Sequence, residues 1–213
     1  MIENIVRNNG FDYVDLGLPS GTIWSIMNIG ASKPSDPGLY FQWGDTKGYT
    51  REQIGYKNEK KAFTWADYKF SIGIDNESNG KFSKYATPDE SMKPEDDAAH
   101  VHMGGDWHIP SPKQIKELIN TENTRCDWIV LDGISGVKIT SKKDKSKSIF
   151  IPAAGFAWEG SLNYNGNQGY IWSSMLSTSY DDVGQCFSFS YLGHANLYSS
   201  YRHRGFSIRG VIG

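Results

Sequence analysis

The chain has 213 residues and a net charge of −2, because 24 acidic side chains face 22 Lys and Arg side chains. That balance argues against a protein that binds nucleic acid or a membrane surface through a broad basic field. No apolar run approaches the roughly 20 residues of a membrane-spanning helix, so we expect no direct membrane insertion. The length fits one medium-sized domain, and no linker-like stretch divides residues 1–213.

The first half of the chain predicts short strands and long loops. Residues 1–10 are predicted to be an N-terminal tail without the basic-then-apolar order of a secretory signal, so any export would use a removed leader or a carrier such as a virion. Residues 11–29 predict two strands around a turn at 18–21. An aromatic segment follows at 38–44, and residues 49–91 predict a long tethered loop region with little regular structure.

Two short helices are predicted next. Residues 98–103 follow Pro94 and three acidic residues and precede two glycines, which is typical of a helix. The second helix begins after Ser111, where Gln114 completes the spacing of a capping box. Its apolar stripe, which we expect to pack on a sheet, consists of Ile115, Leu118 and Ile119.

A meander of three strands is predicted at 128–131, 137–140 and 148–151, with a turn at 132–133. The last two of these strands are joined by a lysine-rich tip at 142–147. We interpret this tip as a solvated hairpin end rather than an anion-binding patch, because an acid interrupts the run and a single tip rarely makes a groove.

The composition changes in the last 66 residues, 148–213. This segment contains no lysine, and its three arginines balance three acids, yet it holds 13 of the 29 aromatic residues of the chain. It is also rich in Ser, Gly and Asn. Tyrosine supplies rigid contact area and Ser or Asn supplies adaptable hydrogen bonds, as in antibody binding loops. A Tyr-rich β-sheet edge without a ligand is the alternative interpretation.

Within this segment, core and surface positions can be separated by pattern. The residues that alternate like core-facing strand positions are Trp172, Phe187, Phe189, Phe206 and Ile208. Residues 179–182 and 191–203 are predicted to be exposed loops. The candidate ligand contacts on these loops are Tyr180, Asp181, Asp182, Tyr191, His194, Asn196, Tyr198, Tyr201 and His203. Scattered surface polarity without a ligand is the alternative for these nine residues.

No catalytic residue is predicted. Ser173 lies inside a strand-like run rather than at a strand-to-helix turn, which does not favour a nucleophile elbow. The adjacent acids at 96–97 and 181–182 face opposite ways on a strand and cannot form a glycosidase pair by themselves. Cys126 and Cys186 are consistent with one long-range disulfide and equally with two reduced, buried thiols.

No metal site and no cofactor are predicted either. The run at 75–80 imitates the first half of a calcium loop, but Ala86 stands where calcium needs a bidentate acid. His100 and His102 point away from one another on a helix, and His108 lies beyond a glycine pair. Capping or surface roles are therefore expected for these histidines instead of zinc binding.

Six sequence motifs follow one another along nearly the whole chain. They are YVDLGLPSGTIWS (13–25), GLYFQWGD (38–45), EDDAAHVHMGGDWHIPS (95–111), IFIPAAGF (149–156), GYIWSS (169–174) and GFSIRGV (205–211). With the capped helix after 111, this pattern resembles the Fibrobacter succinogenes major paralogous domain family of Bacteroides-type bacteria and their phages. The resemblance implies a C-type-lectin-like fold, the broad architecture of formylglycine-generating enzymes and phage tropism determinants.

The resemblance also implies a hypothesis about variation. Several relatives are targets of diversity-generating retroelements, which rewrite adenines near the 3′ end of a gene and do not yield Lys, Glu, Gln, Met or Trp from Asn codons. Between 176 and 213 these types occur once, as Gln185. The chain departs from the family at 103–105, where Met replaces the usual Trp, and at 209–211, where Gly replaces Pro. Neither departure changes the expected fold.

The sequence therefore predicts one α+β, mainly β, C-type-lectin-like domain over 1–213, with a candidate variable region at 160–213. We expect a non-enzymatic protein without cofactor that binds a cell-surface protein or glycan, at a cell surface, outside the cell or on a virion. A structural surface or virion component that uses the same face as a subunit contact is the alternative, and the chain permits an oligomer. A formylglycine-generating-type enzyme is disfavoured, because the cysteines show no redox-pair arrangement in the sequence.

Overall fold

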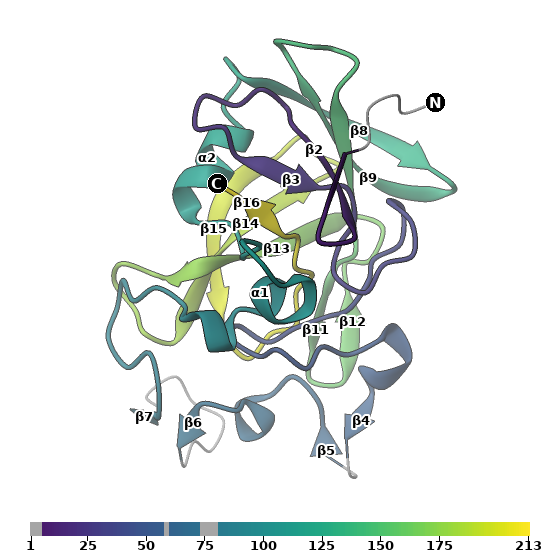
Figure 1. Cartoon of the computed structure of the whole chain (residues 1–213). Coiled ribbons are helices and arrows are strands. Elements are labelled where there is room, and N and C mark those ends of the chain that lie inside the picture. Colours follow the sequence, from purple (N-terminus) through teal and green to yellow (C-terminus); the bar gives the residue numbers. More distant parts are fainter. Residues whose placement is uncertain (1–5, 58–59, 73–80) are drawn as a thin grey trace.

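The computed structural model describes residues 6–57, 60–72 and 81–213 (Figure 1). Strands account for 39% of the chain and helices for 11%, and the strand pairs within the described ranges run antiparallel. Short antiparallel strands with few helices place the chain in the α+β class, as the sequence predicts.

One sheet joins the two ends of the described chain. Its strands, in spatial order, are β1 (Val6–Asn8), β2 (Phe11–Val14), β3 (Ile23–Ser25) and β16 (Val211–Ile212). The prediction of a tail over residues 1–10 is wrong for β1, which pairs with β2. The reason is the Asn9-Gly10 turn, where both residues have positive φ, of 50° and 84°, as tight hairpins require.

Both predicted helices are confirmed. Helix α1 (Ala98–Met103) begins at Asp97, whose carboxylate accepts a hydrogen bond from the His100 backbone N–H at 3.0 Å. Helix α2 (Pro112–Leu118) begins with the predicted capping box, in which Gln114 Oε1 accepts from the Ser111 N–H at 2.8 Å. A short 3-10 helix, η3 (Pro94–Asp96), precedes α1.

The predicted meander is also confirmed, with longer strands than the sequence indicates. It consists of β8 (Thr124–Leu131), β9 (Ile134–Ser141) and β10 (Ser148–Pro152), in the order β10-β9-β8. The turn at Asp132 and Gly133 again combines two positive φ values, 50° and 78°. The lysine-rich tip at 142–147 connects β9 to β10 and is mostly exposed.

The described parts of the region at 49–91 have little regular structure, as predicted, and are held by buried rings. Its elements are η1 (Arg51–Gln53), β4 (Tyr56–Lys57), β5 (Lys60–Lys61), η2 (Trp65–Asp67), β6 (Ser71–Ile72) and β7 (Lys81–Phe82). In Figure 1 these pieces lie together at one end of the molecule. Phe63, Trp65 and Tyr68 are among the buried rings that hold the region against the core. The calcium-like run at 75–80 lies outside the described residues.

The C-terminal segment forms a three-stranded sheet and a small hairpin. The sheet consists of β13 (Gln168–Leu176), β14 (Val183–Ser190) and β15 (Ala195–Tyr201), and the hairpin of β11 (Phe156–Trp158) and β12 (Ser161–Asn163). The prediction of an exposed loop over 191–203 is therefore wrong for β15, which pairs with β14 along its whole length.

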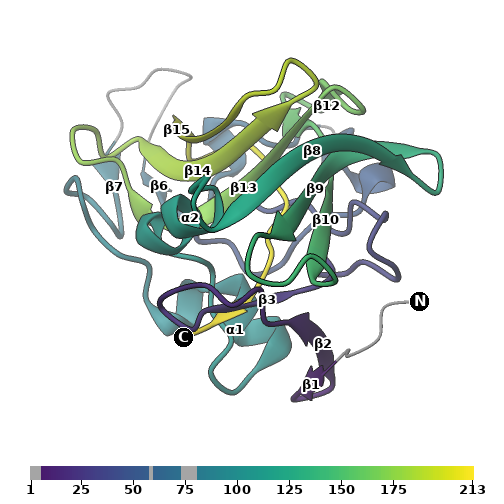
Figure 2. The ribbon, with the colours of Figure 1, turned by 90° about the horizontal axis from the view of Figure 1, so that it is seen from above.

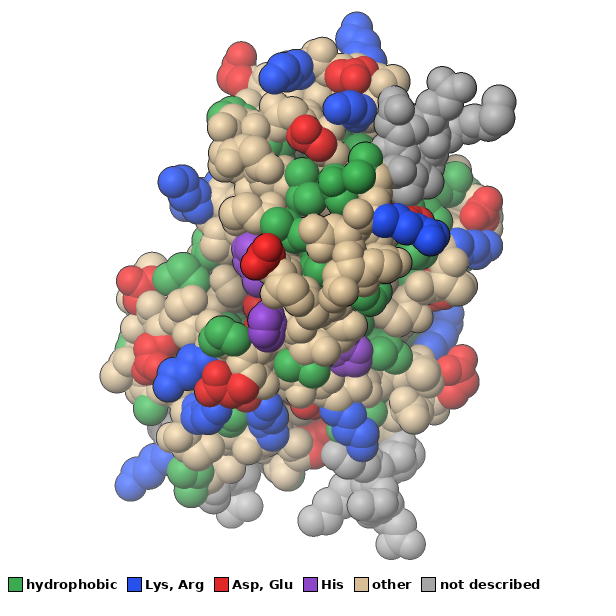
Figure 3. Space-filling model, viewed as in Figure 1, with side chains coloured by type: hydrophobic (Ala, Val, Ile, Leu, Met, Phe, Trp, Pro, Cys, Tyr) green, Lys and Arg blue, Asp and Glu red, His purple; other side chains and the backbone are tan. Residues whose placement is uncertain are grey.

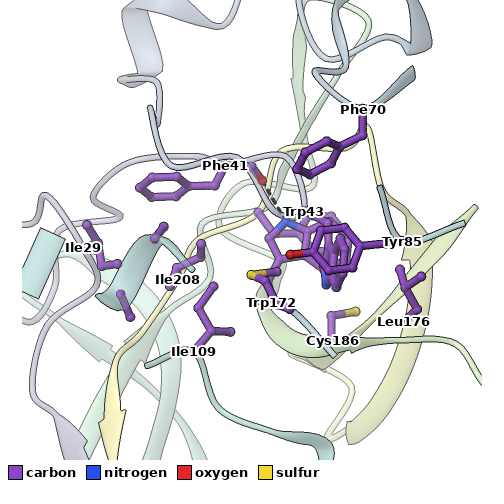
Figure 4. Close-up of a cluster of buried hydrophobic side chains, with 14 of the residues drawn as sticks. Ile29, Phe41, Trp43, Phe70, Tyr85, Ile109, Trp172, Leu176, Cys186 and Ile208 are labelled. Carbon is purple, nitrogen blue, oxygen red and sulfur yellow. Dashed lines mark hydrogen bonds between the residues drawn. The ribbon is translucent and has the colours of Figure 1, made fainter. Parts of the chain in front are cut away.

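The main core lies between this sheet and the loops around it. Trp172 is fully buried beside Trp43 and Cys186, and its indole N–H donates to the Phe41 carbonyl at 2.7 Å (Figure 4). The five residues predicted to face the core are all buried, which confirms that part of the pattern.

A second core cluster fixes the other face of the three-stranded sheet. Ile115 and Leu118 of α2 are fully buried there together with Phe187 and Phe189 of β14. Figure 2 shows α2 lying against this sheet, and α2 contacts each of its three strands. The helix stripe therefore packs on a sheet as predicted. On the opposite face of the sheet, Trp172 and Cys186 belong to the main core, and the part around Ser188 and Asn196 lies outside it.

Candidate ligand-binding site

The face of the three-stranded sheet opposite α2 has two parts: core residues such as Trp172 and Cys186, and a polar part beside them. Ser188 of β14 lies directly opposite Tyr170 of β13 and Asn196 of β15. Because side chains alternate along a strand, these three point to the same side, away from α2. Ser190 and Tyr198 continue this face along β14 and β15. The part of this face that lies outside the main core is thus built from hydroxyls, amides and rings.

The hairpin β11–β12 stands beside this polar face and closes it on one side. Isolated β-bridges join Gly155 to Gly169 and Ala157 to Gly205. The hairpin is therefore connected both to the start of β13 and to the segment that follows β15. Between hairpin and sheet lies a hollow of about 590 Å³. We call it the first hollow.

Four kinds of side chain line the first hollow. Its aromatic residues are Phe156, Trp158, Tyr164, Tyr170, Tyr198 and Phe206. Its amides are Asn163, Gln168 and Asn196, its hydroxyls are Ser188, Ser190 and Ser200, and its basic residues are His194 and Arg204. Phe206 stacks on Tyr170 with centroids 4.8 Å apart and on Trp172 at 4.1 Å, so a rigid aromatic stack supports the lining from below.

A second hollow, of about 670 Å³, lies where the connection between β13 and β14 meets the end of β15. It is lined by Tyr180, Asp181, Asp182, Val183, Tyr198, Ser199, Ser200, Tyr201 and Arg204. Tyr198, Ser200 and Arg204 line both hollows, so the two form neighbouring parts of one surface. We call this surface the C-terminal surface.

Arg204 occupies the boundary between the two hollows. Its guanidinium carbon lies 5.1 Å from the Phe156 ring centroid, 5.3 Å from that of Trp158 and 5.4 Å from that of Tyr201. Its Nη1 donates to Ser200 Oγ at 3.2 Å, and its Nε is buried without a hydrogen-bond partner. None of the ion pairs among the described residues includes Arg204, so the groups that contact its guanidinium are ring faces and the Ser200 hydroxyl, and none of them is a carboxylate.

Arg202, two residues earlier, is fully buried and holds the second hollow in place. Its Nη1 donates to the carbonyl oxygens of Tyr85 and Asp181, both at 2.8 Å, and its Nε donates to the Tyr68 hydroxyl at 2.8 Å. These bonds connect the loop at 84–85 to the turn that carries Asp181. The wall of the second hollow is thereby fixed in one position.

The structure gathers most of the predicted contacts on the C-terminal surface. Tyr180, Asp181, Asp182, Tyr198 and Tyr201 line the second hollow, and His194, Asn196 and Tyr198 line the first. Tyr191 is exposed, but it lies at the turn between β14 and β15 and lines neither hollow.

Two predicted contacts are buried, and for them the prediction of exposure is wrong. His203 is only 4% exposed, because its ring packs against Trp65 with centroids 4.3 Å apart. Burial, with a smaller contribution from the positive charge of Arg204, lowers the pKa of His203 to about 3, so this histidine is neutral. Asp182 is 9% exposed; burial raises its pKa, and its carbonyl accepts from the Arg202 N–H at 3.1 Å.

The sequence-based candidates also omit part of the site. Trp158 and Tyr164 come from the hairpin and the turn after it, and Arg204 follows directly on His203. A signal for Arg204 is present, since the last 66 residues hold only three arginines. Which of the three reaches the surface depends on long-range packing, because Arg202 and Arg209 are both fully buried.

Charged side chains elsewhere do not form a single basic area on the visible face. Figure 3 shows Lys and Arg interspersed with Asp and Glu around its periphery. Within the described ranges, no group of three His, Cys, Asp or Glu side chains is placed to hold a metal ion. His102, for example, has its Nε2 2.7 Å from the Thr46 carbonyl oxygen, consistent with a surface role.

Both cysteines are free thiols. Cys186 is fully buried in the main core, and Cys126 is half-buried on β8. Burial raises the pKa of Cys186 and raises that of Cys126 to about 11, with a smaller contribution from Asp127 to the latter. Both groups therefore stay in the thiol form, which is the less reactive one.

The comparisons with known proteins give no match: no protein-family model, no curated protein and no solved structure is similar to this chain. Across the part of the chain that the structure describes, no helix has the length and apolar character needed to cross a bilayer. The residues of the C-terminal surface are therefore the source of evidence about function.

Proposed function

We propose that this protein is a non-enzymatic binding module whose C-terminal surface binds a cell-surface protein or glycan. One observation carries the proposal: two hollows meet at Tyr198, Ser200 and Arg204, on a surface rich in exposed rings, amides and hydroxyls. Such side chains bury large area at low entropic cost and adapt their hydrogen bonds to a ligand.

The division of the sheet into two faces supports a recognition role. Phe187 and Phe189 anchor β14 in the core beneath α2, while Ser188 and Ser190, which alternate with them, face the first hollow. A ligand would therefore meet a surface that is already formed, and binding would not require the sheet to rearrange. Preorganised surfaces of this kind lose less free energy on binding than flexible ones.

The thiols bear on the enzymatic alternative. A formylglycine-generating activity depends on a redox pair of cysteines, whereas Cys126 and Cys186 are unpaired and held as thiols by burial. This observation favours binding over that chemistry. Activity assays on variants with serine at both positions test the enzymatic alternative.

For the fold and family we propose the C-type-lectin-like architecture of the Fibrobacter succinogenes major paralogous domain. Small sheets, loops pinned by buried rings and a sheet that joins both chain ends support this assignment. With it goes the hypothesis of retroelement diversification in a bacterial or phage surface protein. Comparing the 3′ end of the gene among sibling isolates tests the hypothesis, which requires changes confined to adenine-derived codons at positions such as Asn196 and Tyr198.

Binding to intact bacterial or host cells tests the central proposal, with Tyr198→Ala as the variant. Tyr191→Ala is the matched control, because the two tyrosines are 58% and 56% exposed but only Tyr198 lines the hollows. We expect cell binding to fall about tenfold or more with Tyr198→Ala, as for an aromatic residue at the centre of an interface, and to change little with Tyr191→Ala. Equal binding by both variants and the wild type would refute the proposal.

Assembly is the second candidate function, and exposed apolar side chains favour it. Tyr191 and Leu192 are both exposed at the turn between β14 and β15, beside Tyr198 on the same hairpin. A subunit contact through this hairpin would cover them. Light scattering separates the two functions: a stable oligomer that Leu192→Ser dissociates indicates assembly, and a monomer that binds cells indicates recognition.

A further inference from the structure

Arg204 identifies the class of ligand that the first hollow accepts. We infer that this hollow binds a sugar that carries a carboxylate, such as a uronic or sialic acid unit of a glycan, with Arg204 as the group that binds the carboxylate. The inference rests on the proposed binding function and specifies its ligand. It starts from a positive charge for which the described residues provide no acidic partner.

The lining of the first hollow carries positive charge and no negative charge. Its lining contains no Asp, Glu or Lys, so Arg204 is its one permanently charged side chain, and His194 is the only other basic group. A guanidinium that packs on Phe156, Trp158 and Tyr201 has lost part of its hydration, and ring faces replace that hydration only in part. An anionic group in the hollow would complete this environment.

The donors of Arg204 are positioned before any ligand arrives. The rings hold the guanidinium plane, and Nη1 is fixed by its bond of 3.2 Å to Ser200 Oγ. Nη2 has no hydrogen bond to a described residue. Unlike Nε, it is not one of the buried nitrogen atoms that lack a hydrogen-bond partner. A planar guanidinium matches a carboxylate, as it does a phosphate, through two parallel hydrogen bonds, and the single negative charge of a carboxylate equals the single fixed charge of this lining. The Ser200 hydroxyl beside Nη1 offers a further donor to the same carboxylate.

The rest of the lining favours a sugar over a peptide. None of its residues is aliphatic: apart from His194 and Arg204, it consists of rings, amides and hydroxyls. A pyranose presents C–H groups that pack on ring faces and hydroxyls that pair with amides, and this lining offers no aliphatic pocket for an apolar peptide side chain. Tyr164 and Tyr198 are exposed rings on opposite walls, and Asn163 and Asn196 stand near them on β12 and β15.

The test compares pairs of sugars that differ by the carboxylate alone. Calorimetry or saturation-transfer NMR on the whole chain measures glucuronic acid against glucose and galacturonic acid against galactose, with N-acetylneuraminic acid as a further acid. We expect at least one acid to bind about tenfold or more tightly than its neutral partner, as for a hydrogen bond to a charged group. This comparison uses the wild-type protein, so it stands whether or not a variant folds.

The variant Arg204→Gln should lower affinity for the acid about 10- to 100-fold and leave any binding of the neutral sugar unchanged. Arg204→Lys keeps the charge but loses the two parallel donors, so an intermediate affinity is expected. Arg7→Gln is the control, because Arg7 is exposed and already paired with Asp12 at 2.6 Å. The affinity of the Arg7→Gln variant for the acidic sugar should equal that of the wild type.

Three results would overturn the inference. Equal binding of acidic and neutral sugars would do so, as would the absence of binding by every sugar at millimolar concentration. Binding of a short peptide with a free terminal carboxylate, without binding of any sugar, would assign the hollow to another ligand class. Each of these leaves the proposed function standing as long as Tyr198→Ala still lowers binding to cells, so the two failures are distinguishable.

Discussion

Arg202 is the residue whose loss should cost the most stability near the C-terminal surface. It is fully buried and has four side-chain hydrogen bonds, to the Tyr68 hydroxyl and to the carbonyl oxygens of Lys84, Tyr85 and Asp181, at 2.8 to 3.1 Å. Its guanidinium carbon also lies 4.1 Å from the Phe82 ring centroid. One side chain thus connects the end of β15 to two loops far away in sequence.

The substitution Arg202→Met keeps most of the apolar stem and removes every one of these donors. The Tyr68 hydroxyl keeps its bond to the Trp43 carbonyl, so three carbonyls lose a partner. An unpartnered buried acceptor costs about 1–3 kcal/mol, so the three set an upper range of about 3–9 kcal/mol. Removing a buried charge also recovers its desolvation free energy, and water entering the site satisfies part of the rest. We therefore expect a net loss of about 3–5 kcal/mol in the free energy of unfolding, within the lower half of that range.

Urea denaturation followed by tryptophan fluorescence measures this loss, since a two-state domain gives the free energy of unfolding from its midpoint and slope. Arg7→Met is the control, because Arg7 is exposed on β1, and its loss should stay within about 0.5 kcal/mol. A loss below about 1 kcal/mol for Arg202→Met would refute the reasoning. Such a result would mean that the bonds to Tyr85 and Asp181 contribute nothing net to the fold.

Three further predictions concern other parts of the structure. The folded-state pKa of His203, lowered to about 3, lies below its unfolded value near 6.5, so the unfolded chain binds the extra proton and stability is lost as pH falls. Between pH 7 and 5 the wild type should lose about 2 kcal/mol more than His203→Gln in urea titrations, and parallel pH profiles would contradict this. Gly169→Ala should lower the free energy of unfolding by about 2 kcal/mol, because a Cβ there would stand 2.0 Å from the buried Phe189 ring. Gly55→Ala is the control, because open space surrounds that position. Equal urea midpoints for the two variants would disprove the clash. Thiol titration without reductant should find two free thiols in the urea-unfolded chain, and finding none would reveal a disulfide.

Local features of the fold could be predicted from the sequence because their causes are local. The capping box of α2 requires only that Ser111 and Gln114 be three residues apart, and the structure has its hydrogen bonds. The alternation of Phe187 and Phe189 likewise follows from the geometry of a single strand. In both cases the residues that determine the structure are close neighbours in the sequence.

The strand β15 could not be predicted because one of its faces lines a hollow. That face is polar, and so it lacks the apolar residues that indicate a strand packed on a core. Asn196, Tyr198 and Ser200 alternate with Leu197 and Ser199, a pattern too weakly apolar to indicate a strand. The strand forms because β14 provides its hydrogen-bonding partners and Leu197 packs on the α2 cluster. Both partners lie outside the segment itself.

The burial of His203 and the exposure of Arg204 could not be predicted for the same reason. Adjacent polar residues at the end of a Tyr-rich strand look alike in sequence, but Trp65 from a distant loop covers the first of them. The second emerges between Phe156 and Trp158 of a hairpin that precedes it by more than forty residues. Selecting site residues at this surface requires knowing which distant rings approach it.

The positions of Arg202 and Arg204 explain how this surface can combine a rigid frame with changeable contacts. Arg202 makes four side-chain hydrogen bonds to the protein and fixes the turn at 181, so replacing it should damage the fold before it changes recognition. Arg204 gives one donor to Ser200 and keeps others for a ligand, so replacing it should change recognition before it damages the fold. Asn196 and Tyr198 belong to the second class, because their side chains line the hollows without any side-chain hydrogen bond between them and the core. Under the proposed function, substitutions at these positions would change ligand contacts while Arg202 keeps the wall in place.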